Sequence, residues 1–154
     1  MERVPDALLD EHSLGAMGWY NLAIANLNAA DQLTATNARS SFDEPIRSLY
    51  AHAWELALKA CLRKQGYTPS QIRKSFGHRL DKIWGAVDRE RFDQFQLRDE
   101  LISFINHLTF YNANRLYAYP LTGMRREHEL SFVRATSSRL RISRASAVAI
   151  FHTY

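Results

Sequence analysis

The sequence predicts an all-α protein, an up-and-down bundle of about four main helices with short helices between them. Apolar residues recur every three or four positions along most of the chain, which is the period of an amphipathic helix. No regular series of strands and no internal repeat is visible in the sequence. With 154 residues, 46% of them hydrophobic, the chain is one ordinary domain that can close a core without metals or disulfides.

The first helix is expected in residues 12–30, a stretch that contains no Asp, Glu, Lys or Arg. Its length also suits a membrane span, but its three asparagines disfavour one because buried amides are costly in lipid. Met17, Asn21 and Ile24 share one helical face, with alanines between them that allow close packing. A buried helix, and no membrane span, is therefore predicted. Residues 34–42, rich in Ser, Thr and Asn, are predicted to form a loop.

The second helix is the clearest in the sequence. Asp43 is the expected N-cap, and Pro45 stands in the first turn, where proline is well tolerated. Apolar residues then repeat at helical spacing from Ile46 as far as Gln65. Gly66 follows at the position where a glycine commonly ends a helix.

The remaining elements are also predicted to be helical. A short helix is expected over residues 71–75, broken by Gly77, and another over residues 80–87. A long helix begins at about Arg98 and is ended by Pro120 and Gly123. Residues 140–142 alternate like a strand, whereas residues 145–150 favour a helix, and we predict a helix for this last stretch.

The net charge of +4 is unevenly distributed along the chain. Residues 1–114 carry a net charge of −1, whereas residues 115–154, with seven Arg and two Glu, carry +5. We therefore divide the chain into a helical bundle over residues 12–120 and an Arg-rich segment over residues 121–154, expected to be helical and packed or partly disordered. Such a segment can contact nucleic acid or an acidic partner surface, or it can be a solvated helix.

The single cysteine, Cys61, excludes an internal disulfide framework and a Cys-rich zinc site. It suits a reducing compartment, and we expect a cytoplasmic protein. Residues 1–10 carry four charges and no apolar core, so no secretory signal is expected. No glycine-rich phosphate loop occurs, and Asp, Glu and His are scattered, so neither a cofactor nor a metal site is predicted.

Three blocks of sequence carry a resemblance to a known family. They are AHAWELALKA (residues 51–60), Gly66-Tyr67, and FGHRL (residues 76–80). Together they resemble bacterial proteins of the HEPN superfamily, in which a helix with a Glu-Leu-x-Leu-Lys pattern precedes a Gly-His-x-Leu turn. Many members also have an Arg-Tyr-Pro-like ending, to which residues 114–120 (NRLYAYP) are partly similar. The resemblance covers about residues 12–120.

The resemblance implies a compact helical bundle that forms a homodimer. Members of the superfamily include metal-independent ribonucleases, toxin–antitoxin components and non-catalytic binding domains. The nucleases use an Arg followed four to six residues later by a His, paired across a dimer. Such a His acts on the attacking 2′-hydroxyl or the leaving oxygen, and the Arg stabilises charge on the phosphate.

In this chain the nuclease pair is absent from its expected position near the last core helix. Arg115 is followed by no His at the required distance. Two other pairs fit by count, Arg47 with His52 and Arg73 with His78, and these four residues are the candidate catalytic residues. The departure from the family pattern leaves open whether the chain is an enzyme.

The candidate binding residues form three groups. His52, Glu55 and Lys59 are expected to share a polar face of the second helix, either facing a groove between subunits or simply exposed to solvent. His78 and Arg79 belong to a basic turn that suits either an anion site or the anchoring of the next helix. The last group is Arg115 and Tyr119, where aromatic and cationic side chains suit either base stacking or a dimer interface.

Three hypotheses about function follow. The first is a non-catalytic, homodimeric HEPN-like module that binds RNA, a nucleotide or a partner protein. The second is a metal-independent, toxin-like RNA endonuclease that uses an Arg/His pair across a dimer. The third is a purely structural module, or one that binds a cognate antitoxin-like protein.

Overall fold

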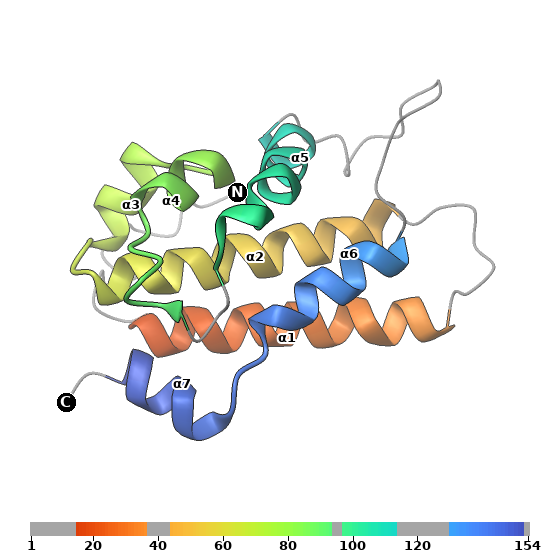
Figure 1. The fold of residues 1–154 in the computed structure, drawn as a ribbon, viewed down its shortest axis with the longest axis horizontal. Coiled ribbons are helices and arrows are strands. Elements are labelled where there is room, and N and C mark those ends of the chain that lie inside the picture. Colours follow the sequence, from red (N-terminus) through yellow and green to blue (C-terminus); the bar gives the residue numbers. More distant parts are fainter. Residues whose placement is uncertain (1–14, 37–43, 94–96, 114–129, 153–154) are drawn as a thin grey trace, which may run out of the picture.

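The computed structural model describes residues 15–36, 44–93, 97–113 and 130–152 (Figure 1). These residues form seven α-helices and no strand, which confirms the all-α class. In chain order the α-helices are α1 (Ala16–Thr36), α2 (Glu44–Lys64), α3 (Pro69–Ser75), α4 (Leu80–Ala86), α5 (Ile102–Ala113), α6 (Leu130–Ser137) and α7 (Arg144–Phe151). Short 3₁₀ helices at Asp99–Leu101 and Ser138–Leu140 precede α5 and follow α6.

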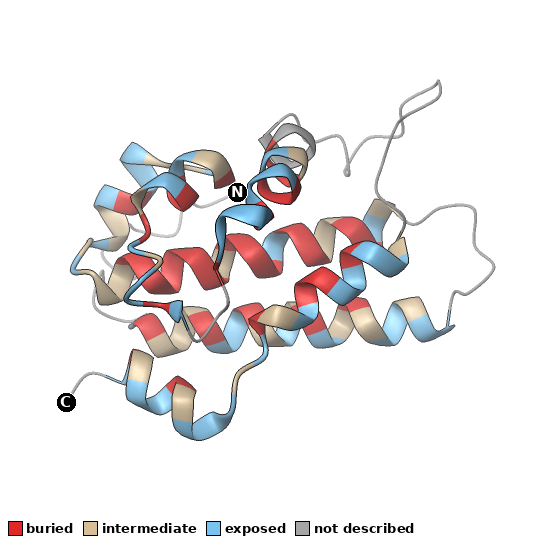
Figure 2. Ribbon diagram, in the orientation of Figure 1, coloured by how far each residue is buried: buried red, intermediate tan, exposed pale blue. Residues whose placement is uncertain are grey.

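Helix α2 is the central element of the fold. It lies antiparallel to α1 along most of its length, and α4, α5 and α6 cover its other sides (Figure 1). Figure 2 shows that most of α2 is buried. The α1 residues that face α2 are small at several positions, among them Ala23 and Ala30, and this allows the two helices to approach closely.

Helix α1 is longer than predicted. It continues to Thr36, so residues 34–36 are helical and not part of a loop. The hydroxyl of Thr34 donates to the carbonyl of Ala30 at 2.7 Å, and that of Thr36 donates to the carbonyl of Gln32 at 3.1 Å. Threonine is tolerated there because its hydroxyl bonds back to the preceding turn. The predicted N-cap of α2, Asp43, lies outside the described residues.

The end of α2 agrees with the prediction. Gly66 has a φ of +103°, a conformation that glycine adopts without strain. The amide of Tyr67 donates to the carbonyl of Leu62, and that of Gly66 donates to the carbonyl of Arg63, both at 3.1 Å. This pair of hydrogen bonds is the Schellman motif, which satisfies carbonyls at the helix end and turns the chain towards α3.

The two short helices are held by side chains at their ends. Thr68 and Gln71 form a capping box at the start of α3, which begins at Pro69, two residues earlier than predicted. Helix α4 receives its cap from another helix, because the amide of Asp81 donates to the hydroxyl of Thr109 on α5 at 2.9 Å. Gln65 then accepts from the amide of Asp88 just beyond the end of α4.

The described part of the C-terminal segment packs into the core. The indole nitrogen of Trp54 on α2 donates to the hydroxyl of Ser137 at 3.0 Å, with both residues buried. The hydroxyl of Tyr20 on α1 donates to the carbonyl of Leu140 at 3.2 Å. The ring of Phe151 stacks on that of Tyr20, with 5.0 Å between centroids. Residues 130–152 thus help to complete the hydrophobic core.

One detail of this segment differs from the prediction. A helix was expected through residues 140–142, but only Leu140 is helical, at the end of a 3₁₀ turn. Arg141 is extended, with φ −80° and ψ 119°, and α7 starts at Arg144 with Ser143 as its N-cap. The alternating pattern there reflects an extended connection between helices.

We expect Ser137→Ala to destabilise the protein by about 1–3 kcal/mol, since the indole N–H of Trp54 would stay buried without a partner. Ser103→Ala is the matched control, because Ser103 is exposed on α5 and should change stability by less than about 0.5 kcal/mol. Urea unfolding followed by circular dichroism measures both. Equal stabilities for the two variants would contradict the described docking of α6 on α2.

Candidate functional site

Three of the predicted binding residues come together in one cluster, which we call the Glu55 centre: Glu55, Lys59 and His78. The ammonium of Lys59 lies 2.6 Å from Oε1 of Glu55, one turn earlier on α2. Nδ1 of His78 lies 2.9 Å from the same oxygen. His78 reaches Glu55 from the turn between α3 and α4, where Gly77, at φ +54°, ends the preceding helix.

The electrostatics of the Glu55 centre depend on burial. Glu55 is only 2% exposed and Lys59 only 9% exposed. A buried carboxylate is costly unless cations and hydrogen-bond donors surround it. Lys59 supplies the charge, and its Nζ lies 6.0 Å from the centre of the Trp19 ring, at the outer limit of a cation–π contact. The pair is therefore an internal ion pair of the fold.

His78 is the exposed member of the Glu55 centre. Its side chain is 69% exposed, although Nδ1 is held by the buried carboxylate. An ionised carboxylate can only accept hydrogen bonds, so Nδ1 carries the proton that is shared with Glu55. Nε2 is then an acceptor in the neutral ring and a donor in the charged ring. The contact fixes the orientation of an imidazole at the protein surface.

His52 does not join the Glu55 centre. It is exposed, whereas Glu55 is buried, and within the described residues it makes no side-chain hydrogen bond or ion pair. Arg47 is only 5% exposed and lies five positions earlier on α2. Five positions correspond to about 140° around a helix, so the two side chains face different directions. The structure does not bring Arg47 and His52 together.

Two arginines lie near the turn between α3 and α4, and only one of them is paired with a carboxylate. Arg79 binds the carboxylate of Asp81 through two nitrogens, at 3.0 and 2.7 Å, and this contact lowers the pKa of Asp81. Arg73 is exposed on α3, and no described residue contacts its side chain by a hydrogen bond or an ion pair. No hydrogen bond or ion pair joins Arg73 to His78 either. The candidates Arg115 and Tyr119 lie outside the described residues.

The arginines of the described C-terminal segment are mostly paired with acidic residues of the preceding helices. Arg134 and Arg141 both contact Asp31 on α1, at 3.4 and 2.7 Å, and Arg139 lies 3.8 Å from Glu100. Asp31 also accepts a hydrogen bond from the hydroxyl of Tyr50, whose pKa burial raises to about 12. Three of the four described arginines of this segment therefore share two carboxylates of the protein itself.

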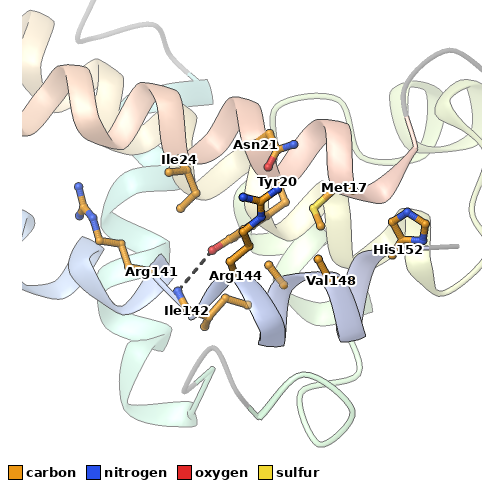
Figure 3. A pocket seen from close by; sticks show the side chains of 10 residues that line it. Met17, Tyr20, Asn21, Ile24, Arg141, Ile142, Arg144, Val148 and His152 are labelled. Carbon is orange, nitrogen blue, oxygen red and sulfur yellow. Dashed lines mark hydrogen bonds between the residues drawn. The ribbon is translucent and has the colours of Figure 1, made fainter.

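A pocket of about 600 Å³ between α1 and α7 was not predicted. Its α1 wall is formed by Met17, Tyr20, Asn21 and Ile24, and its other wall by side chains from residues 141–152 (Figure 3). None of the predicted site residues lines it. The α1 side chains had a visible helical spacing, but no local signal indicates that residues 141–152 pack opposite them.

Three further observations on the described ranges concern metal binding, thiol chemistry and membrane insertion. They contain no group of three or more His, Cys, Asp or Glu side chains that could hold a metal ion. Cys61 is buried, and this burial raises the pKa of its thiol, so the unreactive protonated form dominates. None of the described helices has the length and apolar character that a membrane span requires.

Glu55→Gln should destabilise the protein by about 3 kcal/mol, because the buried ammonium of Lys59 would lose its counter-charge. The matched control is Glu90→Gln, which removes an exposed carboxylate and should cost less than about 0.5 kcal/mol. Adding Lys59→Met to Glu55→Gln should recover most of the loss. Urea unfolding measures these values, and an additive double variant would contradict the ion pair.

Comparisons with known proteins give no relative for this chain: no family model, no curated protein and no solved structure matches it. The resemblance to the HEPN superfamily therefore stays a prediction from the sequence blocks.

Proposed function

We propose that this chain is a non-catalytic helical domain that binds phosphate-bearing ligands, RNA in the first place. The observation that carries the proposal is His78, an exposed imidazole that a buried carboxylate holds in a fixed orientation. Holding an exposed side chain in this way lowers the entropy lost when it binds a ligand. Nucleotides and an antitoxin-like protein are the other ligand classes that the HEPN resemblance implies.

Charge near His78 supports an anionic ligand. Arg73 and Lys74 are exposed on α3, immediately before the His78 turn, and no described residue pairs with either of them. A phosphate accepts hydrogen bonds from guanidinium, ammonium and imidazolium groups alike. Arg73 and Lys74 therefore offer cationic donors within the same short stretch of chain as His78, whereas most described arginines of the C-terminal segment are already paired.

A homodimer is part of this proposal because the resemblance implies one. Two copies of the His78 turn would double the number of phosphate contacts along a strand, and this raises affinity without any new chemistry. A localisation in the cytoplasm, where RNA is abundant, is consistent with the single cysteine. Light scattering coupled to size-exclusion chromatography distinguishes a dimer from a monomer of 17.8 kDa.

The proposal predicts that a fluorescent single-stranded RNA binds at low ionic strength and that binding weakens steeply with salt. Replacing Arg73 and Lys74 together by Gln should lower affinity about tenfold and reduce the salt slope, because two phosphate contacts are lost. Arg98→Gln is the control, because Arg98 is exposed and lies just before the 3₁₀ helix at Asp99–Leu101. Absence of RNA binding by the wild-type protein at low salt would refute the proposed function.

The contact between His78 and Glu55 also favours a second candidate, a metal-independent RNA endonuclease. A carboxylate that orients an imidazole is the arrangement in which a histidine acts as general base or acid. Arg73 of the other subunit would stabilise the charge on the phosphate, since the resemblance implies a pair that forms across a dimer.

This candidate predicts RNA cleavage in the presence of EDTA. His78→Ala should reduce the rate at least about a hundredfold, the contribution typical of a general acid–base residue, whereas His52→Ala should leave it unchanged. Gel analysis of the labelled RNA gives both the rate and the products. Intact RNA after prolonged incubation with wild-type protein would exclude the enzyme and leave the binding proposal standing.

A further inference from the structure

The pocket between α1 and α7 combines apolar walls with positive charge. Met17 and Ile24 from α1 face Ile142, Ala147 and Val148 across a space of about 600 Å³. This volume lies within the range of small-molecule sites, which are mostly apolar with a few polar groups placed to orient the ligand. Figure 3 shows Met17 and Ile24 on α1, with Val148 on α7 and Ile142 just before α7 on the other side.

The ionisable side chains of Arg, Lys, His, Asp or Glu type that line this pocket are all basic. They are Arg141, Arg144 and His152, and no Asp or Glu is among the lining residues. Nη2 of Arg141 donates to Oδ2 of Asp31 at 2.7 Å and to Oδ1 of Asn28 at 2.8 Å. The side chain of Arg144 makes no hydrogen bond or ion pair with any described residue, and it extends from α7 towards α1 (Figure 3). The guanidinium of Arg144 is thus a cation at the mouth of an apolar pocket.

A second polar side chain, across the pocket from Arg144, can also form hydrogen bonds with a ligand. Asn21 lines the pocket from α1, and no described residue contacts its side-chain amide. By contrast, the hydroxyl of Tyr20 is used, since it donates to the carbonyl of Leu140 and accepts from the amide of Ile142 at 3.3 Å. The polar groups available to a ligand are therefore the guanidinium of Arg144 and the amide of Asn21, on opposite walls.

We propose that this pocket binds a small organic anion with an apolar tail, an alkyl carboxylate. The carboxylate accepts two hydrogen bonds from the guanidinium of Arg144, the pairing that its planar geometry favours, and one from the amide of Asn21. The alkyl chain lies between Met17, Ile24 and Val148, where burying each methylene group is favourable. This site is separate from the Glu55 centre and does not depend on the proposed binding of RNA.

The chemistry of the pocket selects against other ligand classes. A cation meets three basic side chains and no carboxylate among the lining residues. A polyphosphate needs several available cations, whereas Arg141 is already neutralised by Asp31. A neutral alkane or alcohol gains the apolar contacts but brings no negative charge to pair with Arg144. A single negative charge attached to a chain satisfies both parts of the pocket.

The experiment uses the fluorescent fatty acid 11-(dansylamino)undecanoate with the full chain, and decanoate as competitor. We expect the dansyl emission to rise and shift to the blue on binding, and decanoate to displace the probe. Decan-1-ol has the same chain without the charge and should compete at least about tenfold more weakly, since a hydrogen bond to a charged group is lost. This comparison uses wild-type protein alone, so it does not depend on the folding of a variant.

Two variants locate the site. Arg144→Gln should weaken probe binding about tenfold or more, and Val148→Glu should abolish it by placing a negative charge against the ligand. Arg98→Gln is the control for loss of one positive charge outside the pocket. No emission change with wild-type protein, equal competition by decan-1-ol, or wild-type affinity in both pocket variants would each overturn the proposal.

Discussion

Three buried polar side chains of α2 have hydrogen-bond partners on other elements, because α2 is the most buried helix of the fold. Tyr50 is matched by Asp31 on α1, Trp54 by Ser137 at the end of α6, and Glu55 by His78 from the turn before α4. Each partner belongs to a different element. These hydrogen bonds fix where the surrounding elements sit, whereas apolar contacts alone would tolerate several arrangements.

Local signals in the sequence predicted the helices well. The 3.6-residue period located α2 and α5, and Gly66 marked the end of α2, because each of these features depends only on neighbouring residues. The sequence could not indicate that Thr109 caps α4 or that Ser137 meets Trp54, since such contacts join residues 28 and 83 positions apart. They are consequences of packing.

In the candidate site, too, contacts between neighbouring residues were predictable and contacts between distant residues were not. The i,i+4 spacing of Glu55 and Lys59 predicts their contact, and the structure has it. The pair Arg47 and His52, chosen because the two residues are five positions apart, is not brought together. The two side chains point to different sides of one helix. The summed charge of the C-terminal segment likewise does not show its local pairing, since the arginines at 134, 139 and 141 share the two carboxylates of Asp31 and Glu100.

The hydrogen bonds from Tyr20 to Leu140 and from Trp54 to Ser137 have a consequence for synthesis of the protein. Their partners are separated by 120 and 83 residues. As the chain leaves the ribosome, α1 and α2 emerge long before the segment that covers them. The buried indole and phenol then stay accessible to water, and to chaperones, until residues 130–152 have been made. The core of this domain is therefore completed only after residues 130–152 have left the ribosome.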